Sequence, residues 1–394
     1  MIYMHICFAS LDYPDKTSGG GVGTYVKIIA RELIRRGHRV SVIALRKGKE
    51  LSDRSNDEGV NIYWITPGNI HWYVSKLPFI GKVFALPIRE IEYSDAVFKA
   101  IRKIDHEEPL DIVEGIETGA FGFRSLRRGI KTVIRLHGER YIFAKYTPPG
   151  RIPVDVRISR YFQRKAFLNA NQLTAPSRVH AEEIKSELKG KVPSIKVIPN
   201  PVQEVSLIKS ENKNERPVFL YIGRLQLSKG ILDLLKTIPL IIEKVPSAHF
   251  IVVGKEHPSV SMKTIEMMMN RLKIGSALDL LGHVNNKDLG SIYSEATAVI
   301  LPSYYESFSY VCVEALMYHV PIVAYNAGAV KDIIKNGENG LLVSTGNVEA
   351  LADACAKAIN MRVKVSAKDE LNKYSVEQVC QETIAVYENL LLRA

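Results

Sequence analysis

Cysteine is scarce in this sequence, and its distribution excludes two classes of protein. Only four cysteines occur in 394 residues, at positions 7, 312, 355 and 380. They lie too far apart for the paired spacing of a zinc site, and they are too few for a disulfide-stabilised scaffold. We therefore expect reduced, mostly buried thiols, as in a cytoplasmic protein.

Long hydrophobic runs and a secretion signal are also absent. No stretch reaches the roughly 18 uncharged apolar residues that a transmembrane helix needs. Residues 1–10 contain no basic n-region and no small-residue cleavage site, so they predict a first strand rather than a signal peptide. We expect a cytoplasmic protein, attached at most to the inner face of the membrane.

Acidic residues are too few to balance the basic ones, and this imbalance bears on the partners. The 53 lysines and arginines exceed the 42 aspartates and glutamates, which gives a formal charge of +11. A basic protein can bind nucleic acid, an anionic membrane or a phosphorylated substrate. Because no helix-turn-helix pattern, zinc-finger spacing or aromatic-rich RNA-binding strand occurs, we expect no nucleic acid partner.

One stretch of the second half combines structural and chemical signals. Residues 298–301 predict a buried parallel strand, and the following sequence PSYYESFSYVCVEAL leads into an apolar helix. Ser307 and Ser309 are candidate helix caps, because a serine hydroxyl accepts hydrogen bonds from the free amides of a first turn. Glu306 is then expected just before the helix, and Glu314 about two turns inside it. Two carboxylates around a helix start can bind the hydroxyl groups of a sugar or a ribose.

A second motif follows a strand that is predicted over residues 218–222. It has the sequence GRLQLSKG, from Gly223 to Gly230, and opens an apolar-faced helix over residues 231–244. Arg224 and Lys229 would place two positive charges beside a diphosphate, and arginine can bind two oxygens at once. The alternative is a loop with two solvated basic side chains.

The first half begins with a βαβ unit. A strand over residues 3–10 leads to the glycine-rich loop SGGGVGT, then to a helix that ends at Arg36-Gly37, and then to a strand over residues 39–45. Backbone amides in such a loop can approach a phosphate. A dinucleotide site would need the Gly-x-Gly-x-x-Gly spacing and an acidic residue after the second strand, and both are missing. The loop therefore predicts either a diphosphate contact or a tight turn without a ligand.

Two further strands of the first half are followed by polar residues. Glu117 and Thr118 follow the strand over residues 111–116, and His137 follows the strand over residues 132–136. Ligands bind at the carboxyl ends of strands in parallel sheets. A lone histidine is more often structural, but His137 precedes a glycine and stands among polar residues, which favours a ligand contact.

Two basic segments of the first half have open interpretations. Residues 71–93 mix aromatic, aliphatic and basic side chains, and Pro78 and Pro87 are expected to break any long helix there. This segment is either a surface for an acceptor or an anionic membrane, or an excursion that covers the core. The basic residues of 151–165 form either a solvated helix face or a site for a phosphorylated acceptor.

Together these motifs resemble those of the retaining, nucleotide-sugar-dependent glycosyltransferases of family 4, the glycosyl transferases group 1. The resemblance rests on Glu306, seven residues and Glu314 in their strand-to-helix setting, and on Gly-Arg-Leu, three residues and Lys-Gly at 223–230. It covers nearly the whole chain and is strongest between Val218 and Val343. It implies an α/β protein with two Rossmann-like domains that face each other across a cleft, the GT-B architecture.

The resemblance also implies the domain boundaries. We expect an N-terminal acceptor-side domain over residues 1–200 and a nucleotide-sugar-binding domain over residues 201–374. Residues 209–216 are the expected linker, and residues 375–394 are expected to form a closing helix that packs back on the N-terminal domain. A length of 394 residues with 46% hydrophobic and 24% charged residues suits two ordinary globular domains.

The resemblance gives each matching residue a role. Arg224 and Lys229 would stabilise the donor diphosphate, which lets a catalytic site work without a metal or a cofactor. Glu306 would bind the sugar hydroxyls, His137 would contact the donor sugar and the acceptor, and Glu314 would bind the ribose. Arg224, Lys229, Glu306 and His137 are the expected catalytic residues. The other expected donor-binding residues are Gly20, Gly21, Gly223, Val284, Ser307, Phe308 and Ser309.

The implied reaction moves a hexose-type sugar, with retention, from a nucleoside diphosphate to an acceptor, with UDP slightly favoured over GDP. The acceptor would be a glycan, a lipid-linked molecule or a polysaccharide precursor. The chain departs from the family pattern at His319, at Ala327-Gly328-Ala329 with Asp332, and at the two serines 307 and 309. Two other classes stay open: a sugar-nucleotide epimerase of the same architecture, and a catalytically silent basic binding protein.

Overall fold

The structure is a computed structural model that describes residues 2–14, 20–46, 52–126, 129–189, 193–203, 216–363 and 371–393. The chain forms two compact units. Unit 1 comprises residues 1–144, 151–201 and 374–394, and unit 2 comprises residues 145–150 and 202–373. The short segment 145–150 therefore differs from the sequence-based boundary, which places it in the first domain. Gly19 and the expected linker, apart from Arg216, lie outside the described residues.

Unit 1 is built on an eight-stranded sheet in the order β3-β4-β2-β1-β5-β6-β7-β8. All neighbouring strands are parallel except β3 and β4, which form an antiparallel pair. The strands are β1 (His5–Leu11), β2 (Arg39–Leu45), β3 (Arg54–Asp57), β4 (Val60–Ile65), β5 (Ile112–Ile116), β6 (Lys131–Arg135), β7 (Gln172–Ala175) and β8 (Ile195–Val197). Because β2 and β5 flank β1, the strand order reverses at β1, and ligands of such sheets bind beyond the strand ends at this point.

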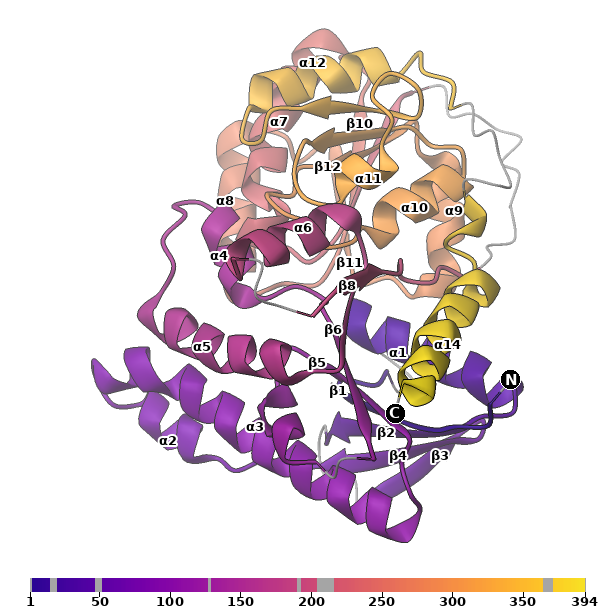
Figure 1. Cartoon of the computed structure of the whole chain (residues 1–394). Coiled ribbons are helices and arrows are strands. Elements are labelled where there is room, and N and C mark those ends of the chain that lie inside the picture. Colours follow the sequence, from indigo (N-terminus) through magenta and orange to yellow (C-terminus); the bar gives the residue numbers. More distant parts are fainter. Residues whose placement is uncertain are drawn as a thin grey trace. The chain divides into compact units, whose positions relative to one another are not determined.

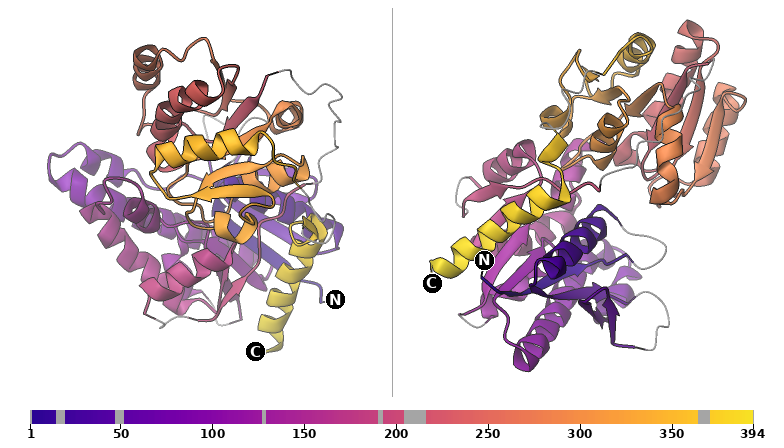
Figure 2. Two further views of the ribbon diagram at one scale, coloured as in Figure 1. Left: turned by 90° about the horizontal axis from the view of Figure 1, so that it is seen from above. Right: turned by 90° about the vertical axis from the view of Figure 1, so that its right-hand side faces the viewer.

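The helices of the first part of the chain and the last helix accompany this sheet (Figure 1). They are α1 (Gly21–Arg35), α2 (Ile70–Ser75), α3 (Ile80–Glu107), η1 (Ala120–Ser125), α4 (Arg140–Tyr146), α5 (Val154–Asn169), α6 (Arg178–Glu187) and α14 (Val376–Leu392). The closing helix α14 lies alongside α1, as Figure 2 also shows. Its residues Ile384 and Tyr387 share one core cluster with Tyr25 and Ile29 of α1.

The long helix α3 shows that one sequence prediction is wrong. It continues through Pro87 for a total of 28 residues, whereas the sequence predicted a break there. A proline in a helix interior removes one N–H donor and costs about 3 kcal/mol. Leu86 and Pro87 are both buried in unit 1, so the packing of this face offsets the lost hydrogen bond. Pro78 does separate α2 from α3.

Unit 2 contains a fully parallel six-stranded sheet in the order β11-β10-β9-β12-β13-β14. The strands are β9 (Val218–Ile222), β10 (His249–Val253), β11 (Leu278–Gly282), β12 (Ala298–Leu301), β13 (Ile322–Tyr325) and β14 (Gly340–Val343). If these strands are numbered within unit 2 from β9 onward, their spatial order is 3-2-1-4-5-6, which is the doubly wound order of a Rossmann fold. The direction of winding reverses between the first strand, β9, and the fourth, β12. The carboxyl ends of β9 and β12 therefore lie at the point where such folds bind ligands.

Helices connect these strands and supply the core of unit 2. They are η2 (Leu227–Lys229), α7 (Ile231–Lys244), α8 (Met262–Leu272), η3 (Asn286–Asp288), α9 (Leu289–Glu295), α10 (Tyr310–Met317), α11 (Val330–Ile333) and α12 (Val348–Ala358). Apolar residues of α7 and α12, among them Leu235, Ile238 and Leu351, form the core on one face of the sheet. After α10, His319 adopts a φ of 59°, the left-handed conformation that the sequence predicts histidine to tolerate there.

Two expectations from composition can be compared with the structure. All four cysteines are free and buried, as expected. Among the described residues, every helix is too short or too polar to cross a lipid bilayer.

Candidate active site

Two loops of unit 2 are in backbone contact at the point where the strand order reverses. One loop follows β9 and the other follows β12. A Cβ atom on Gly230 would lie 1.9 Å from the carbonyl oxygen of Pro302, and Gly230 has a φ of 70°, so only glycine fits. The amide of Tyr304 donates to the carbonyl of Ser228 at 3.0 Å. The two motifs that the sequence presents separately thus form one site.

Tyr221 shapes the loop that carries Arg224 and Lys229, the two residues predicted to bind the diphosphate. Its hydroxyl, on a buried side chain, donates to the carbonyl of Arg224 at 3.0 Å and lies 3.5 Å from the carbonyl of Lys229. One hydroxyl therefore fixes both ends of the loop. The Arg224 side chain is exposed, and its guanidinium has no hydrogen-bond partner within the described part of the chain. It is available for an anionic ligand.

Lys229 and Glu306 form an ion pair at the centre of this site. The Nζ atom of Lys229 lies 2.7 Å from each carboxylate oxygen of Glu306. Glu306 is buried, with 4% of its surface exposed, and Lys229 supplies the hydrogen-bonded partner that a buried carboxylate requires. About a quarter of the Lys229 side chain remains accessible, at 24%. Lys229 can therefore meet a ligand while it holds Glu306.

The loop after β13 packs against the backbone of Glu306. The amide of Ala329 donates to the carbonyl of Glu306 at 2.7 Å. A Cβ atom on Gly328 would lie 2.2 Å from the same oxygen, and Gly328 has a φ of 61°. The Ala-Gly-Ala sequence that departs from the family pattern thus keeps the one glycine that this contact requires.

Asp233 connects the first turn of α7 to the Glu306 loop. Its Oδ2 atom accepts hydrogen bonds from the hydroxyls of Tyr304 at 2.6 Å and Tyr325 at 3.0 Å. Asp233 is buried, and Tyr304 is two residues before Glu306. Sequence reasoning missed this contact, although an acidic residue in an apolar helix face was a visible signal.

The start of α10 confirms one predicted cap and corrects the position of Glu314. Ser309 accepts a hydrogen bond from the amide of Cys312 at 3.3 Å, as a helix cap does. Because α10 begins at Tyr310, Glu314 lies just over one turn inside it, not two. Glu314 accepts from the hydroxyl of Tyr293 at 2.8 Å. Burial raises the pKa of Glu314, and this hydrogen bond opposes the rise.

The other predicted donor-binding residues lie at the same edge of the sheet. Gly223 directly follows β9, and its amide donates to the carbonyl of Val253 at 2.9 Å. Val284 follows β11, and Ser307 and Phe308 stand between Glu306 and α10. A role of these positions in donor binding stays a prediction.

In unit 1, Asp12 organises the described part of the glycine-rich loop. Its carboxylate accepts from the amide of Gly20 at 3.1 Å, and a Cβ atom on Gly23 would lie 2.7 Å from it. Gly20 is the N-cap of α1 and Gly21 its first residue. The loop therefore opens a helix, as predicted, while its contact with a diphosphate stays a prediction.

His137 lies at the carboxyl end of β6, against Tyr25 of α1. The two rings meet edge to face, with centroids 5.2 Å apart. Arg135 stacks on Tyr25 at 4.0 Å and donates to the carbonyl of Ile198 and to the side chain of Asn200. Burial and the charge of Arg135 lower the pKa of His137 well below its usual value. The imidazole is therefore neutral at pH 7 and suited to bind a hydroxyl group.

Glu117 belongs to a buried cluster with Glu139 and His180. Their potential ligand atoms all lie within 4.8 Å of one another. Burial raises the pKa of Glu117 to about 6 and that of Glu139 well above its usual range, and it lowers that of His180 to about 4. Glu117 accepts from the amide of Gly138 at 2.7 Å, which favours its charged form and opposes the effect of burial. Two carboxylates and an imidazole are ligands that transition metals accept.

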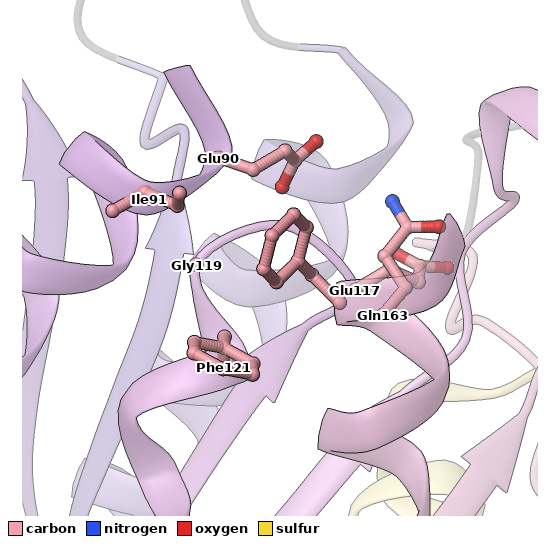
Figure 3. A pocket seen from close by; sticks show the side chains of 7 residues that line it. Glu90, Ile91, Glu117, Gly119, Phe121 and Gln163 are labelled. Carbon is pink, nitrogen blue, oxygen red and sulfur yellow. The ribbon is translucent and has the colours of Figure 1, made fainter. Parts of the chain in front are cut away.

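A small cavity opens beside Glu117 (Figure 3). It is lined by α3, the turn after β5, η1 and α5. Figure 3 shows Glu90 on one side of the cavity and Glu117 and Gln163 on the other. Burial raises the pKa of Glu90 to about 7. The lining residues are Glu90, Ile91, Glu117, Gly119, Phe121, Phe162 and Gln163.

Comparison with known families identifies the chain. The family model Glycosyltransferase Family 4 matches residues 19–204, and the model Glycosyl transferases group 1 matches residues 203–377. The chain belongs to the GT-B glycosyltransferases. The ion pair of Lys229 and Glu306 thus lies in the unit that group 1 describes, and His137 lies in the unit that family 4 describes.

Similar proteins of nearly the same length support the same architecture. A glycosyltransferase of Methanocaldococcus jannaschii, itself uncharacterised, is 25% identical over 98% of each chain. Sucrose-phosphate synthase of Thermosynechococcus elongatus has a TM-score of 0.78 at 19% identity and covers 99% of this chain and 100% of its own. HepE of Anabaena, solved with UDP and glucose, has a TM-score of 0.70 at 17% identity over 98% of this chain and 100% of its own. These findings confirm the predicted GT-B glycosyltransferase fold.

Proposed function

We propose that this GT-B glycosyltransferase transfers a hexose-type sugar from a nucleoside diphosphate to a hydroxyl group, with retention of configuration. The observation that carries the proposal is the ion pair of Lys229 and Glu306 beside the exposed Arg224. This arrangement places cations for a diphosphate next to a carboxylate for sugar hydroxyls, at the edge of a Rossmann sheet where ligands bind.

Two cations in one loop suit a diphosphate leaving group. When the bond between the anomeric carbon and the donor phosphate oxygen breaks, negative charge develops on that oxygen. Arg224 and Lys229 stabilise this charge, so we expect transfer without a divalent metal. The acceptor oxygen forms its bond to the same face of the anomeric carbon and gives its proton to the departing phosphate oxygen. Glu306 and the amides of Ser307, Phe308 and Ser309 hold the sugar.

The donor and acceptor can be assigned by class. The complex of HepE with UDP and glucose supports UDP as the nucleotide and a hexose as the sugar, and Glu314 would accept from the ribose hydroxyls. In unit 1 we assign the neutral His137 to a hydroxyl contact, and Gly20 and Gly21 to the diphosphate. A glycan, a lipid-linked molecule or a polysaccharide precursor is the acceptor. Buried free thiols and a nucleotide donor both suit a cytoplasmic enzyme.

The product of a surrogate reaction tests this function. Purified protein is incubated with UDP-glucose, glycerol as acceptor and a chelator, and the product is followed by NMR. We expect a new α-glucoside, because the donor is α-linked and retention preserves that configuration. A β-glucoside would contradict retention, and a requirement for added metal would contradict the role of the two cations. A changed sugar nucleotide without any glycoside would identify an epimerase instead.

A further inference from the structure

Exposed apolar side chains gather on one part of unit 1. Eighteen large apolar residues are exposed among the residues that the structure describes, and eight of them lie between residues 70 and 91. The eight are Ile70, Trp72, Tyr73, Leu77, Phe79, Ile80, Phe84 and Ile91. We call them the α2–α3 apolar surface. The most exposed is Phe79, at 82%, and Trp72 is exposed at 51%.

These side chains do not serve the core of unit 1. Helix α2 has no buried residue at all. It is held against the start of α3 by a close backbone approach, where a Cβ atom on Gly81 would lie 2.7 Å from the carbonyl of Val74. The inner face of α3 is a different set of residues, including Leu86, Pro87 and Val97. Figure 1 shows α2 beside the start of α3 at one end of the unit. The eight side chains of the α2–α3 apolar surface therefore do not cover the core, in contrast to one of the two interpretations of residues 71–93.

Near this surface two basic side chains are exposed, whereas two acidic side chains face inward. Lys76 and Lys82 are exposed, and the ammonium of Lys76 lies 3.3 Å from the centre of the Trp72 ring. The two acids of this part of α3 are turned inward: Glu90 is buried, and Glu92 accepts from the backbone amides of Ile70 and His71 and from the His71 ring.

The next acidic residue along α3 is exposed, but it adds no uncompensated negative charge near this surface. Asp95 is paired with Lys99 at 2.7 Å, so its charge is compensated. The α2–α3 apolar surface is therefore apolar at its centre and positive around it.

We propose that the α2–α3 apolar surface docks on an anionic lipid bilayer. Aromatic and aliphatic side chains would enter the boundary between headgroups and acyl chains, while Lys76 and Lys82 bind lipid phosphates. A second copy of the chain fits less well, because a symmetric contact would bring the same lysines together. Ile91 belongs to this surface and also lines the cavity of Glu90 and Glu117, so the bilayer would lie next to that cavity.

The two tryptophans of the sequence provide a direct test. Trp64 lies on β4 and donates to Ser55, whereas Trp72 lies on the surface, so a Trp64→Phe variant has Trp72 as its sole tryptophan, which is excited selectively at wavelengths that tyrosine does not absorb. We expect its emission to shift to shorter wavelength with vesicles of phosphatidylcholine and phosphatidylglycerol, and much less with phosphatidylcholine alone. Added salt should reduce the shift. An emission that no vesicle changes would overturn the proposal.

Matched variants assign the contact to this surface. Phe79→Ser should weaken binding about tenfold in vesicle co-sedimentation, because one buried phenyl ring is lost. Met267→Ser, at another exposed apolar site, on α8 and with 60% exposure, should leave binding unchanged. Lys76→Gln and Lys82→Gln should each weaken it about fivefold and reduce its salt dependence. Equal binding by Phe79→Ser and the unchanged protein would contradict the assignment.

Two controls separate docking from other effects. Sedimentation velocity without lipid detects self-association, and a dimer that Phe79→Ser dissociates, together with no vesicle binding, would show that a second copy covers the surface. Release of nucleotide from a water-soluble donor should be the same for Phe79→Ser and the unchanged protein. The docking proposal does not depend on the proposed transfer reaction, since vesicle binding is measured without a donor.

Discussion

The Nζ atom of Lys229 lies 2.7 Å from both carboxylate oxygens of Glu306, although the two residues are 77 positions apart. The contact joins the loop after β9 to the loop after β12. It brings the cation expected to bind a diphosphate into direct contact with the carboxylate expected to bind a sugar. A donor would therefore meet both residues together.

Removal of Lys229 should affect both turnover and stability. In Lys229→Met the buried carboxylate of Glu306 has lost its counter-ion, which costs about 3 kcal/mol, and the diphosphate has lost one cation. We expect turnover to fall by about two to three orders of magnitude and the melting temperature to fall as well. In Lys229→Met/Glu306→Gln the stability should recover while turnover does not. A double variant as unstable as the single one would contradict the pairing.

The two tyrosines that share Asp233 should have different effects. Tyr304→Phe loosens the loop before Glu306, so we expect kcat/KM to fall about tenfold with a small change in stability. Tyr325→Phe removes a hydroxyl from the core at the end of β13, so we expect a loss of about 1 kcal/mol of stability with little change in turnover. Equal effects of both variants on kcat/KM would contradict a positioning role for Tyr304.

Tyr293 should control the donor affinity through Glu314. Its hydroxyl is the hydrogen-bond donor that opposes the rise in the pKa of Glu314. In Tyr293→Phe that pKa rises further, so Glu314 becomes protonated at a higher pH than in the unchanged protein. We expect the KM for the donor to increase, and the increase to shrink as the pH rises. Tyr318→Phe is the matched control, because this ring stacks on Tyr293 at 5.2 Å.

Glu90 should make the stability of the protein depend on pH. Burial raises its pKa from 4.5 in the unfolded chain to about 7. Between these values the folded state binds more protons than the unfolded state, so stability is full below pH 4.5 and decreases as the pH rises through 7. The shift corresponds to roughly 3 kcal/mol. Glu90→Gln should therefore stabilise the protein at pH 8 but hardly at pH 5, as thermal unfolding at both pH values can show. An equal effect of Glu90→Gln on stability at pH 8 and at pH 5 would contradict this pH dependence.

Local patterns predicted much of unit 2. Helix α7 was expected over residues 231–244 and is observed from Ile231 to Lys244, because its apolar period and the glycine before it are both local signals. The cap at Ser309 is another local interaction. Pro87 shows the limit of such signals: tertiary packing of α3 overrides its local preference to end a helix.

The partners of the site residues could not be predicted in the same way. Lys229 and Glu306 meet because β9 and β12 are neighbours, and strand order is set by the packing of the whole sheet. Tyr221, Asp233 and Glu90 are polar residues within apolar segments, and their partners become visible only when distant elements pack together. The roles of Arg224 and His137 came from the family resemblance and stay predictions.

The most direct test of the account measures nucleoside diphosphate release from a panel of UDP-, GDP- and ADP-sugars, with a chelator present and no acceptor. The unchanged protein should release the diphosphate slowly from one donor, Arg224→Ala should release it at least a hundredfold more slowly, and Arg271→Ala, an exposed arginine at the end of α8, should match the unchanged protein. Release by Arg224→Ala at the unchanged rate, or neither release nor binding of any donor by the unchanged protein, would contradict the proposed transfer site.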